Sequence, residues 1–392
     1  MEEQTKKRGF FAALHTLSAG DKVWLCLLLT FPVNLLLVLL AKAFPATVER
    51  VYANGFRPAV MGAVSRVTGV LPFSLAEVLI LAAVLCGLLL HILAVIAIVR
   101  TVRRKESVLR RLADWLVRIL AVFFCGVLVF NLTYGLCYYR ENTGVKICKY
   151  HIAYTETDIV NIAAYMTNDL NNVRRKAGLD DREPCSFTLT VKELSDACRQ
   201  AYASLAEDYP VYGGDYGSPK PVMLSKPWTY TYVMGMYFPF TGEANYNTNI
   251  PSVELPHTVL HEMAHQRGIA AEDEANFAAF LAGRYCEDKR VGYSALFESW
   301  CYVMNSLRRA DEGMYHAVLD LACEGVKADM QHTEVFWESY DSPLAAFSDD
   351  VNRVYLESNG VEFGTASYSL SVQYILDYYV NTYLMDHIVF NE

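Results

Sequence analysis

The stretch His261-Glu262-Met263-Ala264-His265 decides how this chain is interpreted. Residues four apart on a helix lie on one face, so His261 and His265 can direct two imidazoles at one metal ion. Glu262 directly follows the first histidine, where an HExxH helix holds the carboxylate that activates a water molecule. The alternative is a solvated helix face that carries two histidines by chance. The surrounding sequence favours the metal site.

Two consecutive helices are predicted around this motif. Pro256 suits the first turn of a helix, because its ring fixes a helical backbone angle and the amide it lacks needs no partner there. An apolar face follows at Val259, Leu260, Met263 and Ala264. Gly268 is typical of the left-handed residue that ends a helix. The acidic run 272–274 then opens a second helical pattern, where it also complements the helix dipole.

A catalytic zinc site needs a third protein ligand and an open position for water. The metzincin pattern HExxHxxGxxH would place a histidine at position 271, which is Ala271. Gluzincins instead take a glutamate from a following helix. Glu272 is favoured because Asn276, four residues later on the same face, can support it, whereas Glu274 points roughly 200° away around the helix. We therefore predict Zn²⁺ on the two histidines and Glu272, with Glu274 as the competing ligand.

Other side chains are weaker candidates for this site. His257, one turn before His261, either supports a ligand or is a core histidine. Glu243 and Asn245 belong to a loop that could rim a substrate cleft, although the same residues are typical of a solvated turn. Tyr368 could donate a hydrogen bond to a developing oxyanion, as one of 26 tyrosines.

The chain resembles known families at these residues. The run from Glu272 to Asn276 is similar to the third-ligand helix of gluzincins, especially ImmA/IrrE-like peptidases. Residues 235–245, the run HEMAHQRG and the run EDEANFAAFL together resemble an uncharacterised family of bacterial membrane proteins, domain of unknown function 3810. Three membrane spans and a late Ser-Tyr motif extend the likeness over nearly the whole chain. The resemblance implies a zinc peptidase but brings no known substrate.

The composition indicates a membrane part joined to a water-soluble part. Hydrophobic residues make up 53% of the chain and charged residues 20%, with a positive mean hydropathy. Apolar stretches at about 22–44, 73–99 and 112–136 are each long enough to cross a bilayer. The first stretch has a basic leader and a small-residue site at 41–43, but two more spans follow, so we interpret it as a retained anchor.

Basic residues predict the orientation. Lys6, Lys7 and Arg8 precede the first span, and the densest basic run, 100–111, lies between the second and third spans. The positive-inside rule places both in the cytoplasm and everything after about residue 137 outside. The run 100–111 is explained by topology, so no nucleic-acid partner is expected. Loop 44–72 is expected to carry a short amphipathic helix on the outer face.

Residues 137–392 are long enough for one compact domain, and residues 1–136 form the membrane region. Helical periodicity covers 156–178, 191–207 and most of the chain after Pro256, while 209–249 predicts a small sheet with strands at 222–224 and 230–238. Apart from Cys137 at the membrane boundary, six cysteines lie in this domain without a recognisable spacing, so disulfides are permitted but not required.

The expected protein is a three-span helical anchor that carries a mainly α, α+β, gluzincin-type domain outside the plasma membrane. The expected activity is hydrolysis of a peptide or protein substrate, with Glu262 as general base. A non-catalytic metal-binding surface sensor or scaffold is the alternative. A channel or transporter is disfavoured because the spans carry few ionisable residues, all near their ends or able to snorkel.

Overall fold

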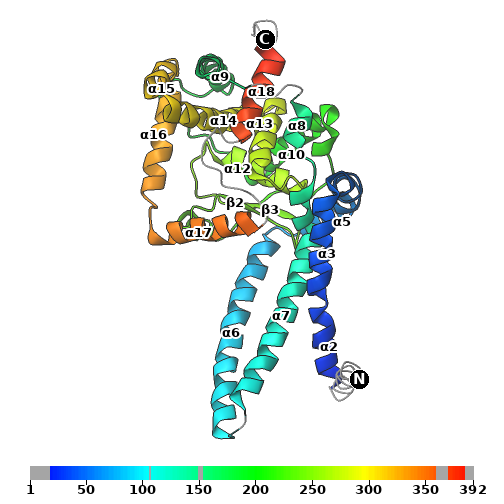
Figure 1. Ribbon diagram of the computed structural model, residues 1–392. Helices are drawn as coiled ribbons and strands as arrows, with labels where there is room; N and C mark the ends of the chain where they lie inside the picture. The colour runs from blue at the N-terminus through cyan, green and yellow to red at the C-terminus, as the bar shows by residue number, and fades with distance from the viewer. Residues whose placement is uncertain (1–17, 106, 149–152, 359–369, 385–392) are drawn as a thin grey trace.

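The computed structural model describes residues 18–105, 107–148, 153–358 and 370–384. It consists of a stalk of long helices and a mostly helical globular domain at one end of that stalk (Figure 1). Three helical segments of the stalk are long and apolar enough to cross a membrane: α2–α3 (Ala19–Ala43), α6 (Leu75–Arg103) and α7 (Val108–Thr133). They confirm the three predicted spans.

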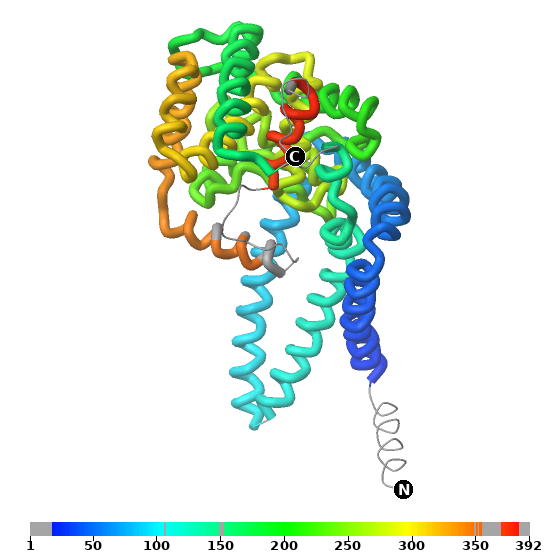
Figure 2. Tube along the Cα trace, turned by 45° about the horizontal axis from the view of Figure 1, so that its top comes forward, coloured from blue at the N-terminus to red at the C-terminus, as the bar shows by residue number. Residues whose placement is uncertain are grey.

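The spans are not equally close to one another. The segment α2–α3 (Ala19–Leu28 and Thr30–Ala43) packs along α7, whereas α6 meets α7 at the end far from the domain and diverges from it toward the domain (Figures 1 and 2). Asn131 of α7 donates a hydrogen bond to Asn34 of α3 at 2.9 Å, and Asn34 donates to the carbonyl of Phe124 at 3.0 Å. Side-chain amides of this kind hold apolar helices together where lipid supplies no hydrophobic driving force.

The segment between the first two spans is more than the single short helix predicted for it. It contains α4 (Pro45–Thr47), the π-helix η1 (Val48–Phe56) and α5 (Arg57–Gly69). Arg57, Met61 and Ser65 are buried where this segment packs against the domain. Contacts therefore cross the predicted boundary between residues 136 and 137.

The helices of the domain pack around α14 (Lys289–Ala310), whose buried Trp300 and Phe297 lie in the central core. The predicted helical stretches are confirmed within the described residues, and α8 and α11 are additional. The other elements are η2 (Gly135–Tyr139), α8 (Thr143–Ile147), α9 (Glu156–Lys176), α10 (Val191–Asp208), η3 (Pro210–Tyr212), α11 (Ser225–Thr229), α12 (Leu255–Gln266), α13 (Glu272–Tyr285), α15 (Glu312–Leu319), α16 (Glu324–Glu338), α17 (Pro343–Ser358), α18 (Leu370–Tyr379) and η4 (Val380–Leu384).

The small sheet is confirmed, but its strands differ from the predicted ones. β1 (Lys220–Pro221) pairs parallel to β3 (Glu243–Tyr246), and β2 (Gly235–Phe238) pairs antiparallel to β3, in the order β1-β3-β2. The predicted strand 230–238 begins only at Gly235, because α11 and a turn with left-handed Tyr232 occupy the residues before it. The predicted strand 222–224 is a turn whose amides at 223 and 224 donate to Glu77 of α6.

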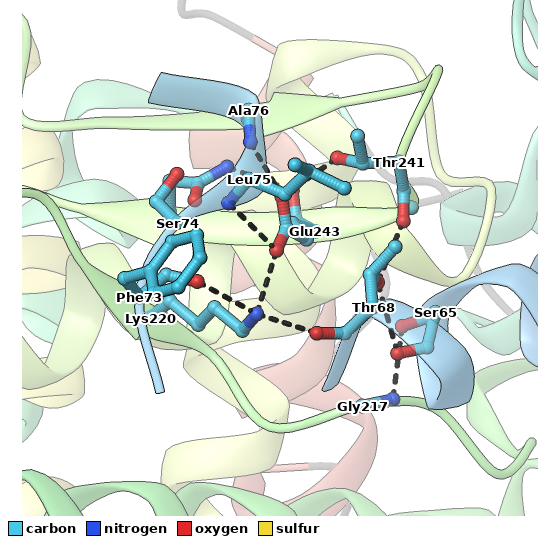
Figure 3. A network of polar contacts seen from close by, with 12 residues as sticks. Ser65, Thr68, Phe73, Ser74, Leu75, Ala76, Gly217, Lys220, Thr241 and Glu243 are labelled. Atoms are coloured by element: carbon cyan, nitrogen blue, oxygen red, sulfur yellow. Dashed lines mark hydrogen bonds and ion pairs between the residues drawn. The ribbon is translucent and has the colours of Figure 1, made fainter. Parts of the chain in front are cut away.

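A buried ion pair fastens the second span to this sheet (Figure 3). The Glu243 carboxylate accepts a hydrogen bond from Lys220 Nζ at 2.7 Å and others from the Leu75 and Ala76 amides at 3.2 and 2.7 Å. Those amides open α6, so the carboxylate also interacts favourably with the positive end of the helix dipole. Thr241 donates to the same carboxylate at 2.8 Å. The end of α6 is thus held at the edge of the domain.

All ten cysteines are free thiols. The six cysteines of the domain therefore form no disulfide framework in this structure, and all six, including Cys198 and Cys286, pack in or against the core.

Replacing Glu243 by alanine is expected to destabilise the protein by about 3–5 kcal/mol, because it leaves the Lys220 ammonium buried without its partner. The free energy of unfolding by denaturant in detergent micelles measures this. The double variant Glu243→Gln/Lys220→Met should recover most of the loss. The exposed ion pair Lys192–Asp196 supplies the control, since Asp196→Ala should leave the unfolding midpoint nearly unchanged. Equal losses of stability in the Glu243 and Asp196 variants would contradict the stabilising role of the buried Glu243–Lys220 pair.

Candidate metal centre

The HExxH sequence lies on α12, as predicted. Pro256 occupies the first turn of the helix, and Gly268 adopts a left-handed φ of 85° just after its end. The chain then reverses within a few residues, and α13 begins at Glu272. This short reversal explains how a glutamate only seven residues after His265 can return to the histidines.

Three side chains converge at one point between α12 and α13. His261, His265 and Glu272 each offer one ligand atom, and these atoms lie within 4.8 Å of one another. The Glu272 carboxylate is 3.1 Å from His261 Nε2 and 3.5 Å from His265 Nε2. The structure thus brings together the predicted triad of ligands.

The orientation of each imidazole suits metal binding. His261 Nδ1 donates a hydrogen bond to Asn276 Oδ1 at 2.8 Å, and His265 Nδ1 donates to the Ile269 carbonyl at 2.7 Å. A proton fixed on Nδ1 leaves the lone pair of Nε2 free, which is the arrangement of histidines that bind metals. Both Nε2 atoms face the Glu272 carboxylate, so the donor set fits Zn²⁺ with two nitrogens and one carboxylate oxygen.

The charges of the surrounding side chains favour a positive charge where His261, His265 and Glu272 converge. Burial alone would lower the pKa of His265, but the Glu272 carboxylate raises that pKa to about 9. In return, and against the effect of burial, His265 and His261 hold the pKa of Glu272 far below its usual range. The Glu272 side chain remains 41% exposed, so the centre is open on one side.

Glu262 lies beside this triad on the same helix. Its side chain is buried, and among the described residues no hydrogen-bond partner reaches its Oε2. Burial raises the pKa of Glu262, while the two histidines act in the opposite direction. Gly235, at the start of β2, leaves the room that the carboxylate needs, since a Cβ there would stand 2.6 Å from Glu262 Cγ and Oε1.

A second layer of contacts, which could not be predicted from the sequence, comes from the membrane side. Arg57, the first residue of α5, donates hydrogen bonds to the carbonyls of His265 and Gln266, both at 3.1 Å. The hydroxyl of Tyr134, the residue after span α7, lies 3.0 Å from His265 Nδ1. No local sequence signal marks either residue as part of the site, because each reaches it from a distant part of the chain.

Several weaker candidates lie elsewhere. Glu274 hydrogen-bonds to the amide of Thr143 at 2.8 Å and to its hydroxyl, at the start of α8, and not to the histidines. Glu243 and Asn245 are buried in β3 and do not rim a cleft. His257 is buried too, and burial together with His261 lowers its pKa to about 3, so it is a neutral core histidine. Tyr368 lies outside the described residues.

The comparison with protein families gives one match. The family model described as Protein of unknown function (DUF3810) matches residues 52–376. The chain belongs to this family. The match confirms the resemblance noted from the motif and the spans, and it covers the two membrane-side contacts Arg57 and Tyr134 as well as the triad. No curated protein and no solved structure matches the chain.

Replacing Asn276 by leucine is expected to weaken zinc binding by about 10- to 100-fold, because His261 loses the acceptor that fixes its ring. Competition with a chelating dye on the purified full chain measures the dissociation constant. Asn276→Asp keeps an acceptor and should bind zinc at least as tightly as the original chain. Asn161→Leu, on the exposed face of α9, is the matched control. An unchanged affinity in Asn276→Leu would refute the supporting role of this residue.

Proposed function

We propose that the protein is a membrane-anchored zinc metallopeptidase. His261, His265 and Glu272 would hold the metal, and the edge strand β2 would lie along the substrate. The observation that carries the proposal is the buried Glu262 carboxylate, whose Oε2 lacks a partner among the described residues next to the ligand triad. Burying a carboxylate oxygen without a hydrogen-bond partner is energetically costly. A role as general base in catalysis would explain why this carboxylate is buried there.

The chemistry follows from the residues present. Zinc, when bound at such a triad, polarises a carbonyl oxygen and lowers the pKa of a coordinated water. Glu262 would take a proton from the attacking water and return it to the leaving amine. Burial raises the pKa of Glu262, and a base whose pKa lies nearer to neutral can both accept and release that proton. Gly235 would keep the space for this movement free.

The sheet supports a polypeptide substrate. Among the described residues β2 pairs with β3 alone, so its other edge would be the one to pair with an extended peptide. Such pairing does not depend on the side chains of the substrate. The contact of His265 with Tyr134 puts the triad at the membrane end of the domain, so substrate segments near the bilayer would be the accessible ones. The positive-inside rule would place this end outside the cytoplasm.

A metal-binding sensor or scaffold without catalysis is the second candidate. The open side of the centre is compatible with it, since Glu272 remains partly exposed. Glu262 distinguishes the two functions, because a purely structural metal site needs no free carboxylate beside its ligands.

Glu262→Gln is expected to keep the metal and to lose peptide hydrolysis by about 100- to 10,000-fold, because the general base is removed. Elemental analysis of the purified full chain and a peptide-library cleavage assay measure the two effects. His261→Ala should lose the metal, whereas His316→Ala, an exposed histidine on α15, should not. Full hydrolysis by Glu262→Gln would refute the mechanism. A zinc-loaded original chain that cleaves nothing would favour the sensor.

Gly235→Val is expected to lower kcat by about 100-fold with the metal content unchanged, because a side chain at this position displaces the Glu262 carboxylate. Steady-state kinetics on a peptide that the original chain cleaves provide the measurement. Gly87→Val is the matched control, since a Cβ at Gly87 of α6 meets nothing within 4 Å. Normal turnover by Gly235→Val would show that Glu262 does not need this space.

A further inference from the structure

Helix α17 is placed unlike the other helices of the domain. It runs crosswise to the spans, on the membrane side of the sheet and at the level where α6 begins (Figure 1). The turned view keeps it at that level, below the body of the domain (Figure 2). A helix in this position runs roughly parallel to the membrane surface that the spans define.

One face of α17 is apolar and exposed. Leu344, Phe347, Val351 and Val354 follow one another at helical spacings of three and four residues, and each is more than half exposed. Phe347 reaches 65% exposure. Ala345 is buried on a different face, where the helix meets the domain. The charged pair Arg353–Asp350 lies away from the apolar stripe and is also exposed. An uncovered stripe of large apolar side chains marks an interaction surface.

The start of α17 is firmly attached to the domain. Ser342 donates a hydrogen bond to the Tyr230 carbonyl at 3.1 Å, and the rings of Tyr230 and Tyr340 meet at 4.9 Å. Asn249 donates to the Tyr340 hydroxyl at 3.1 Å. The apolar stripe therefore extends from a segment that is attached to the domain.

Two exposed apolar residues at the outer end of α6 indicate that the partner is the lipid bilayer. Met223 and Leu224, exposed and apolar, lie at the outer end of α6, where their amides donate to Glu77 in the first turn of that span. The lipid-facing surface of the spans thus continues onto the underside of the domain, at the level of α17. An amphipathic helix at that level can insert its apolar face into the boundary between headgroups and acyl chains.

We propose that α17 lies in the bilayer interface, with the stripe Leu344, Phe347, Val351 and Val354 among the acyl chains of the leaflet next to the domain. It forms a second membrane contact beside the spans and supports the loop that leads into β2. Because apolar area drives the contact, it requires no anionic lipid. The contact does not depend on a metal ion or on peptide hydrolysis.

Photo-crosslinking in nanodiscs of zwitterionic lipid tests the contact. Benzoylphenylalanine replaces Phe347 or Val351 on the stripe, and Ala346 or Arg353 on other faces of the same helix, in the full chain. Mass spectrometry after illumination should find lipid adducts at 347 and 351 and none above background at 346 and 353. The matched positions share one helix, so a folding defect would affect both sets.

Two results would overturn the proposal. Crosslinks from 347 and 351 to a second copy of the chain would show that the stripe is a protein interface. Absence of lipid adducts at 347 and 351, or equal lipid adducts at all four positions, would show that this face does not select the bilayer.

Discussion

The hydrogen bonds of the buried Arg57 guanidinium fix the arrangement of the segments around the candidate metal centre. It donates hydrogen bonds to the Thr133 carbonyl at the end of span α7, to the His265 and Gln266 carbonyls at the end of α12, and to the Tyr237 hydroxyl in β2. Burying a charge is costly unless its hydrogen bonds are met. Here the partially negative carboxyl ends of two helices meet them. One side chain thereby fixes a span, the motif helix and the edge strand relative to one another.

The two histidines of the motif are consequently positioned from different parts of the molecule. His261 is oriented by Asn276, a neighbour on α13. His265 has its backbone carbonyl bound by Arg57 and its ring next to Tyr134, both on the membrane side. His265 Nδ1 also bonds to the nearby Ile269 carbonyl. The two histidines of one helix are thus held by neighbouring residues and, at His265, by two distant segments as well.

The residues that could be predicted from the sequence are those whose partners lie close to them in the chain. Helical spacing predicted His261, His265, Glu272 and Asn276 as site residues, and the length of the apolar stretches predicted the spans. Each of these signals lies within one helix. Arg57, Tyr134 and the space at Gly235 could not be predicted, since they depend on packing between segments far apart in the chain. Glu243 was misjudged for the same reason: its sequence neighbours resemble a turn, but its carboxylate is buried against Lys220 and the start of α6. The start of β2 could not be predicted either, because α11 and the turn after it occupy residues whose pattern is typical of a strand.

The position of Arg57 and Tyr134 also bears on how this family can vary. A transmembrane segment that merely tethers a domain makes no contact with the interior of that domain. Here Arg57, between the first two spans, and Tyr134, directly after the third, supply part of the wall around a histidine of the HExxH motif. The spans and the motif helix therefore form one structural unit in this chain. A domain cut free after residue 137, or grafted onto foreign spans, would retain every proposed ligand and lose the frame that aligns them.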